Sequence, residues 1–198
     1  MKNILLTLLV TGLTIPQLNP SIINNASQTS TLQESITVNQ EHTFVSIDPT
    51  ASISSLNKTP FNQIANTNYE ASIVGRYESG KEEGYSTVLI KDLTTNSYKE
   101  FKFQEINSNN QLTALKVPCG TGDTVFIIVG SAFGRLSYGG SLYSLNVQTG
   151  ESKLVESTFN SLEQIVNAQI DGSQINLTCY LFDDNYNNYV TYNRAINY

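Results

Sequence analysis

Oxygen-bearing side chains near the C-terminus have the spacing of a cation site. They stand within five residues of one another: Asp183, Asp184, Asn185 and Asn187. Calcium takes about six to eight oxygen ligands, and alternating carboxylate and amide oxygens open many calcium loops. The EF-hand pattern fails further on, because Asn188 stands where it requires glycine and Arg194 where it requires glutamate. The run therefore predicts either a calcium site of another kind or a polar hairpin turn capped by Asp and Asn side chains.

Tyrosines gather in the same region, and their chemistry suits binding. They are Tyr180, Tyr186, Tyr189, Tyr192 and Tyr198. On a strand, Tyr180 would stand on the face opposite Cys179, and the even spacing of Tyr186 and Tyr192 predicts that they share an exposed face with Tyr198. Aromatic rings among Asn and Asp side chains suit stacking on sugars or on a protein partner. We therefore predict that Tyr180, Tyr186 and Tyr192 bind a ligand, although β-propensity alone also explains exposed tyrosines.

A glycine-rich run over residues 130–140 is a second candidate binding element. Gly139 and Gly140 could let backbone N–H groups approach an anion or a glycan, or they could simply allow a bulge and a tight turn between strands. A nucleotide-phosphate loop is excluded, because no Lys-Ser or Lys-Thr pair follows the glycines.

Residues that could perform catalysis are few. His42 is the only histidine, and no serine-nucleophile elbow or catalytic-cysteine signature accompanies it. A hydrolase with paired carboxylates needs two acids across a cleft. Asp183, Asp184, Glu82 and Glu83 are candidates only in the sense that any acids would be, and Glu82 and Glu83 lie between glycines in the pattern of a solvated hairpin tip. The sequence favours a protein that is not an enzyme, with a glycan-processing enzyme that uses an acidic pair as the alternative.

Two cysteines complete the set of reactive side chains. Cys119 and Cys179 each continue an alternating apolar run, so both thiols are expected to point into the core. They could form a disulfide in an oxidising compartment, or they could be two buried free thiols that act as small apolar residues. A zinc site is not expected, since no histidine accompanies them.

Charge and the N-terminal residues indicate where the protein acts. The chain has a net charge of −6 with its eleven Lys and Arg scattered singly, which excludes nucleic acid as a partner. One lysine followed by the apolar run 4–15 predicts an export signal over residues 1–26, with a polar, flexible leader over 27–35. No cysteine follows the apolar run directly, so lipid modification is not expected. We therefore predict a secreted or envelope-associated protein whose mature chain has no transmembrane segment and needs no cofactor, calcium apart.

These side chains must be positioned by strands, because no long stretch shows the 3.6-residue period of a helix. Alternation and turn residues predict short strands near 36–38 and 44–47 and ten further strands: 69–77, 85–93, 97–104, 111–117, 124–132, 141–147, 151–157, 164–171, 174–182 and 188–196. Residues 36–198 are expected to form a single all-β domain.

A weak internal repeat predicts how these strands are grouped. Residues 88–99 align with residues 142–153, and both segments contain a turn of the kind that joins antiparallel strands. Two consecutive four-strand antiparallel meanders, each like a propeller blade, follow from this repeat. Since a closed propeller needs more blades, we expect the two meanders to pack as a sandwich or an open barrel.

Two motifs relate the chain to a known family. The glycine-rich run has the pattern G-x-x-x-G-x-x-x-x-G-G-x-L-Y-x-L-N over 130–146, and Y-x-x-D-D-N-Y follows over 180–186. With these motifs the chain resembles an uncharacterised bacterial family of exported Gram-positive proteins, domain of unknown function 4652. The resemblance implies a β-rich domain in an envelope or extracellular setting and implies no activity.

The sequence as a whole predicts an exported β-rich interaction module that binds a protein or a glycan at the cell envelope. The alternatives are the glycan-processing enzyme and a structural domain that calcium stabilises.

Overall fold

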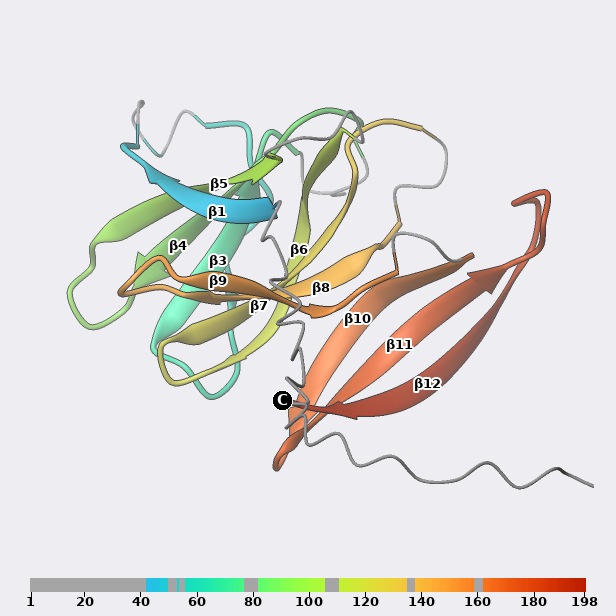
Figure 1. The fold of residues 1–198 in the computed structure, drawn as a ribbon. Coiled ribbons are helices and arrows are strands. Elements are labelled where there is room, and N and C mark those ends of the chain that lie inside the picture. The colour runs from blue at the N-terminus through green and yellow to red at the C-terminus, as the bar shows by residue number, and fades with distance from the viewer. Residues whose placement is uncertain are drawn as a thin grey trace, which may run out of the picture. The chain divides into compact units, whose positions relative to one another are not determined.

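The computed structural model describes residues 42–49, 53, 56–76, 82–105, 111–134, 138–158 and 162–198. All of them lie in one compact unit, Val38–Tyr198, and they form twelve strands with no α-helix (Figure 1). The predicted export signal over 1–26, the leader over 27–35 and the strand near 36–38 lie outside the described residues.

The strands form three antiparallel sheets. The N-terminal sheet has the order β1 (His42–Ile47), β5 (Tyr98–Glu105), β4 (Thr87–Asp92), β3 (Tyr69–Val74) and β2 (Asn62–Gln63). The central sheet runs through β6 (Leu112–Thr121), β7 (Thr124–Ser131), β8 (Ser141–Asn146) and β9 (Ser152–Glu156). The C-terminal sheet consists of β10 (Glu163–Asp171), β11 (Gln174–Phe182) and β12 (Tyr189–Asn197).

The central sheet is apolar on both faces and has a core on each side. Ile127 and Tyr143 lie in a first core with Phe101 of the N-terminal sheet. Phe126 lies in a second core with Leu177 of the C-terminal sheet. Strand β7 is buried over six consecutive residues for this reason, because both of its faces are covered. The result is a layered, sandwich-like arrangement in which none of the three described sheets closes into a barrel.

The all-β class and the sandwich are confirmed, and each of the ten strands predicted after residue 68 overlaps an observed strand. The division into two four-strand meanders is wrong. Strand β6 belongs to the central sheet, since a two-residue turn at Gly122 (φ +54°) joins it directly to β7 and pairs Thr121 with Thr124. The last three strands form a sheet of their own.

Both cysteines lie in the second core, as predicted. Burial raises the pKa of Cys119 to about 12 and that of Cys179 to about 11. Both are free thiols in the structure. Because both cysteines lie in one core, a disulfide between them in an oxidising compartment stays a prediction.

Candidate binding site

The outer face of the C-terminal sheet carries polar side chains in rows that cross its strands. Asn167 of β10 is paired with Thr178 of β11, which is paired with Asn193 of β12. The next row consists of Gln169, Asn176 and Ala195. We call these six residues the amide face. Residues directly opposite each other on antiparallel strands share a face and lie close together, so the five polar residues of the amide face form one group of hydrogen-bonding side chains, with Ala195 at its edge.

Alternation along the strands produces this surface. Ile175, Leu177 and Cys179 of β11 are fully buried in the second core. The residues between them, Asn176 and Thr178, must therefore point to the opposite side of the sheet. The alternation of polar residues along β11 can be recognised in the sequence. Which residues of β10 and β12 lie beside them follows only from the strand register.

The amide face is hollowed. A cavity of about 480 Å³ is lined by its six residues together with Arg194. Asn167 is held in place by a hydrogen bond that its Oδ1 accepts from Lys116 Nζ of the central sheet, at 2.9 Å. Amide side chains both donate and accept hydrogen bonds. The lining therefore offers hydrogen-bond donors and acceptors of the kind that pair with hydroxyl groups.

Aromatic side chains border the amide face at the hairpin between β11 and β12. The rings of Tyr180 and Tyr189 are stacked, with centroids 4.1 Å apart. Phe182 packs against Tyr189 at 5.4 Å and against Tyr186 at 5.9 Å. Tyr186 and Tyr189 expose 44% and 49% of their surface, so the cluster presents ring area to solvent. We call these four residues the aromatic cluster.

The predicted tyrosine set is only partly brought together. Tyr180 stands opposite Cys179, as expected, but Tyr192 lies on the inner face and packs against the second core. Tyr198 also departs from the group, since its ring contacts Phe126 at 5.4 Å. The expectation of one exposed face for Tyr186, Tyr192 and Tyr198 is wrong, because Tyr186 lies in the turn (φ +56°) and interrupts the alternation. Tyr189 takes the place of Tyr192, and pairing of Phe182 with Tyr189 across the hairpin is the signal that would have found it.

Tyr192 belongs to an ion network on the inner face. Its hydroxyl donates a hydrogen bond to Glu163. Arg194 donates to Glu163 Oε1 from Nε at 3.1 Å and from Nη2 at 2.6 Å, and to Glu156 Oε1 at 2.8 Å. Burial would raise the pKa of Glu163, but the hydrogen bonds from Tyr192 and Arg194 outweigh it and lower that pKa. The network joins β9 of the central sheet to the C-terminal sheet.

Gly139 and Gly140 have a packing role. The backbone groups of Gly140 and Ile165 exchange two hydrogen bonds of 3.0 Å. A Cβ atom at Gly139 would come within 2.2 Å of the Ile165 carbonyl oxygen, and one at Gly140 within 2.0 Å of the Val129 carbonyl oxygen. The Gly140 amide predicted to approach a ligand is therefore occupied, and the close approach of strands explains the two glycines.

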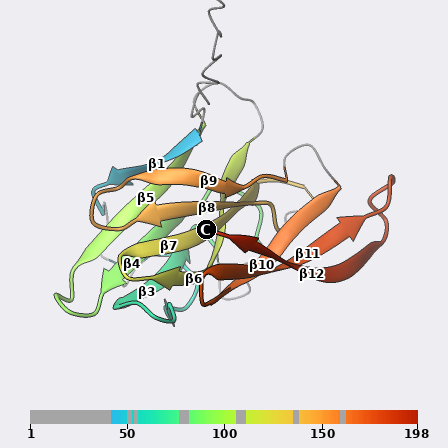
Figure 2. The same ribbon diagram turned by 60° about the horizontal axis from the view of Figure 1, so that its bottom comes forward.

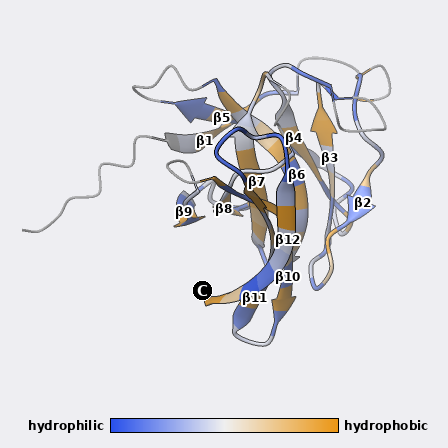
Figure 3. Cartoon of the chain, turned by 90° about the vertical axis from the view of Figure 1, so that its right-hand side faces the viewer, coloured by the Kyte–Doolittle hydropathy of each residue, from blue (hydrophilic) through white to orange (hydrophobic). Residues whose placement is uncertain are grey.

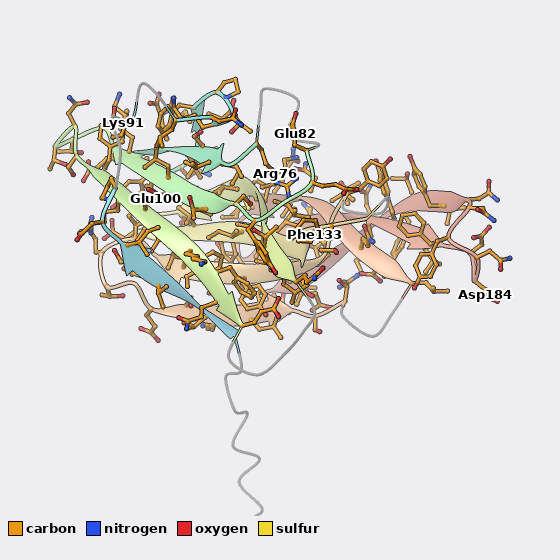
Figure 4. The ribbon with its side chains drawn as sticks, turned by 90° about the horizontal axis from the view of Figure 1, so that it is seen from above. Arg76, Glu82, Lys91, Glu100, Phe133 and Asp184 are labelled. Carbon is orange, nitrogen blue, oxygen red and sulfur yellow. The ribbon has the colours of Figure 1, made fainter. Side chains whose placement is uncertain are left out.

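The predicted calcium run forms the turn between β11 and β12, which Figure 3 colours as hydrophilic. Asp183 accepts from the Asn187 N–H at 2.8 Å through Oδ1 and from Asn188 Nδ2 at 3.0 Å through Oδ2. The hydrogen bond from the Asn187 backbone lowers the pKa of Asp183. Asp184 lies at the tip of the hairpin (Figure 4). Calcium binding by Asp183, Asp184, Asn185 and Asn187 stays a prediction, which a melting curve with and without a chelator would test.

The other acidic pair, Glu82 and Glu83, contacts neighbouring segments of the chain. Arg76, whose side chain is buried, donates a hydrogen bond to the Glu82 carbonyl oxygen (Figure 4). Glu83 accepts one from the Gly134 N–H at 3.2 Å. In the part of the chain that the structure describes, no group of three or more His, Cys, Asp or Glu side chains could hold a metal ion.

Comparison with known proteins places the chain. The model of a family described as Domain of unknown function (DUF4652) matches residues 20–196. The chain belongs to this family. The resemblance drawn from the glycine-rich run and the Asp-Asp-Asn motif is thus confirmed. No curated protein matches the chain.

A solved structure is similar in fold. It is the crystal structure, at 2.70 Å resolution, of a protein from Clostridium novyi NT provisionally described as a conserved lipoprotein. The match has a TM-score of 0.66 and 21% sequence identity, and it covers 80% of this chain and 96% of the other. At this identity the likeness shows the fold alone. Within the described residues of the present chain, no helix has the length and apolar character to cross a membrane.

Proposed function

We propose that this chain is an envelope-associated β module that binds an uncharged glycan across the amide face, with the aromatic cluster at one end of the site. The observation that carries the proposal is the hollow lined by Asn, Gln and Thr side chains from all three strands of the C-terminal sheet.

The chemistry of the amide face suits sugar hydroxyls. Each Asn or Gln side chain offers two donors and an acceptor oxygen, which can pair with neighbouring hydroxyl groups of one sugar. A tyrosine ring covers the apolar C–H face of a sugar while its hydroxyl remains solvated. Tyr189 is exposed enough to take this role.

Charge argues for an uncharged ligand. None of the six residues of the amide face is ionisable. Two cations border it, and both already have partners: Arg194 is bound by Glu163 and Glu156, and Lys116 donates a hydrogen bond to Asn167. The chain is acidic overall, so an anionic polymer would meet net repulsion.

The setting rests on two supports of different kinds. The sequence predicts export, and the structural neighbour is provisionally described as a lipoprotein. Both favour the cell envelope as the place where this chain meets its ligand.

The glycan-processing alternative has less support. A general acid works best with a raised pKa, whereas the pKa of Asp183 is lowered by hydrogen bonds within its own turn. Its carboxylate serves the hairpin, and Asp184 is exposed beside it. A module that binds a protein instead of a glycan is the better supported alternative. The experiment below distinguishes glycan binding from protein binding.

The test is binding of the purified full chain to an array of uncharged oligosaccharides, namely glucans, mannans and chitin oligomers. Replacing Gln169→Ala and Asn176→Ala together removes one exposed row and should weaken binding by about tenfold or more, since each lost hydrogen bond is worth about 1 kcal/mol. Tyr189→Ala should weaken it as well. Asn62→Ala, an exposed amide on β2, is the control and should bind as the parent does. Binding to no oligosaccharide below about 1 mM, or equal binding by all variants, would overturn the proposal.

A further inference from the structure

Strand β12 is a long, regular edge strand. It lies at the end of the C-terminal sheet (Figure 2), and nine consecutive residues pair with β11 without a bulge. Among the described residues β11 is its only strand partner. An edge of this kind presents a row of backbone donors and acceptors to any other strand.

The usual protections of an edge are missing from β12. Proteins blunt edges with lysine, proline, bulges or very short strands. The sequence Tyr189–Asn197 has no lysine and no proline. Its one charge, Arg194, is bound by Glu156 and Glu163, so it presents no unpaired charge to an approaching strand.

An apolar side chain at one end of β12 lacks cover. Val190 exposes 61% of its surface, more than any other large apolar side chain in the described part of the chain. It lies on the inner face with Tyr192, Arg194 and Ile196, since these residues alternate along the strand. Ile196, at the opposite end, is only partly buried against the second core.

The strand is self-complementary about its middle residue. If a second β12 ran antiparallel with the two Asn193 residues opposite each other, Val190 would face Ile196 at each end. Arg194 would face Tyr192, whose ring and carboxylate partner Glu163 both attract a guanidinium group. On the outer face Thr191 would face Ala195, and the two Asn193 amides could exchange hydrogen bonds.

Neighbouring registers are worse. Moving the twofold axis to Tyr192 would place Val190 opposite Arg194 and leave Ile196 without an apolar partner. Moving it to Arg194 would bring two guanidinium groups directly opposite each other, and like charges in that position are destabilising. An axis between residues would oppose outward-pointing to inward-pointing backbone groups and form no ladder. Charge and apolar matching therefore select Asn193 as the axis.

We propose that two copies of this chain pair through their β12 edges, antiparallel and with the twofold axis at Asn193, to form one continuous six-stranded sheet. Such an interface is isologous and closes on itself. The pairing does not rest on the proposed glycan binding, but it would place two amide faces side by side on one surface and so permit bivalent binding.

Sedimentation of the purified full chain tests the association. A single strand pair is a small interface, so the average mass should rise from one chain toward two between about 1 and 300 µM. Val190→Lys adds a charge at the edge, and the twofold dimer would contain this change in both copies. It should therefore weaken association by about tenfold or more. Leu181→Lys makes the same change on the same face one strand inward, at a residue that is 43% exposed, and should leave association unchanged. A chain that stays monomeric throughout, or a dimer that both variants affect equally, would overturn the proposal.

Cross-linking tests the register. Asn193→Cys places two thiols opposite each other across the axis, and mild oxidation should give a covalent dimer. Thr191→Cys lies on the same exposed face, but its two copies would be roughly 13 Å apart along the strands, so it should not cross-link. The native cysteines are buried and do not compete. Equal cross-linking of both variants, or of neither, would reject this register even if the chain dimerises.

Discussion

Replacing Arg194 with methionine should destabilise the C-terminal sheet by an amount that the ion network predicts. The variant keeps the apolar stem of the side chain and removes three charged hydrogen bonds, two to Glu163 and one to Glu156. Hydrogen bonds to charged groups contribute roughly 1.5–3 kcal/mol each when buried, and exposed ion pairs less than about 1 kcal/mol. The side chains of Arg194 and Glu163 are 28% and 17% exposed, which lies between these cases, so we expect a loss of about 2 kcal/mol.

Thermal unfolding at 1 µM, where the chain should be monomeric, measures this loss. For a chain of this size, about 2 kcal/mol corresponds to a melting temperature lower by roughly 4–8 °C. Lys91→Met is the matched control (Figure 4), because Lys91 meets Glu70 at 3.6 Å in a single ion pair and should cost less than about 0.5 kcal/mol. Glu163→Gln combined with Arg194→Met should cost less than the sum of the two single changes, since the residues are directly coupled.

The dependence on pH has a definite sign. The pKa of Glu163 is lowered in the folded chain, so its contribution is present above the ordinary glutamate pKa and is lost as the pH falls through the lowered value. The difference between parent and variant should therefore be full at pH 7 and shrink below about pH 4. A melting temperature within about 1 °C of the parent's at pH 7 would count as no effect and would refute the reasoning. So would a loss of stability at pH 3 as large as the loss at pH 7.

Two further predictions concern packing. Gly140→Ala should lower stability by more than about 3 kcal/mol or prevent folding, because the added Cβ meets the Val129 carbonyl oxygen at 2.0 Å. Gly172→Ala should cost only about 1 kcal/mol, since its Cβ meets no atom within 4 Å and only the positive φ is strained. Chemical denaturation of both variants measures the two losses of stability, and equal losses would contradict the prediction. Cys119 and Cys179 should not react with a thiol reagent at pH 8 in the folded chain, because burial raises both pKa values. Both should react once the chain is denatured without reductant. If neither reacts in the denatured chain, the two thiols are joined in the predicted disulfide.

Strands such as β11 could be predicted because they bury one set of alternating residues. The inner face of β11 was predicted from the alternation of Ile175, Leu177 and Cys179, and all three are buried in the structure. The same alternation assigned Tyr180 to the other face. Pairing between strands was predicted less well, because a repeat in sequence does not say which sheet a strand joins. The tight turn at Gly122 assigns β6 to the central sheet, against the grouping that the repeat suggested.

The candidate site illustrates the same division. Asn176 and Thr178 could be recognised in the sequence as an outward polar pair, yet Asn167 and Asn193 join them only through the register of β10 and β12. The even spacing of Tyr186, Tyr192 and Tyr198 misled, because alternation holds along a strand and fails at the turn that contains Tyr186. Gly139 and Gly140 had two interpretations, and the backbone contacts with Ile165 and Val129 favour packing.

The sequence by itself determined the β class, the strand positions and the inward direction of both cysteines, since alternation and turn chemistry are local properties of the chain. Only the tertiary structure decided that a central sheet is buried on both faces, that amides from three strands line one hollow and that β12 is an edge among the described strands. Those features depend on pairing between distant segments, which the free energy of the whole fold selects and which no short stretch of sequence encodes.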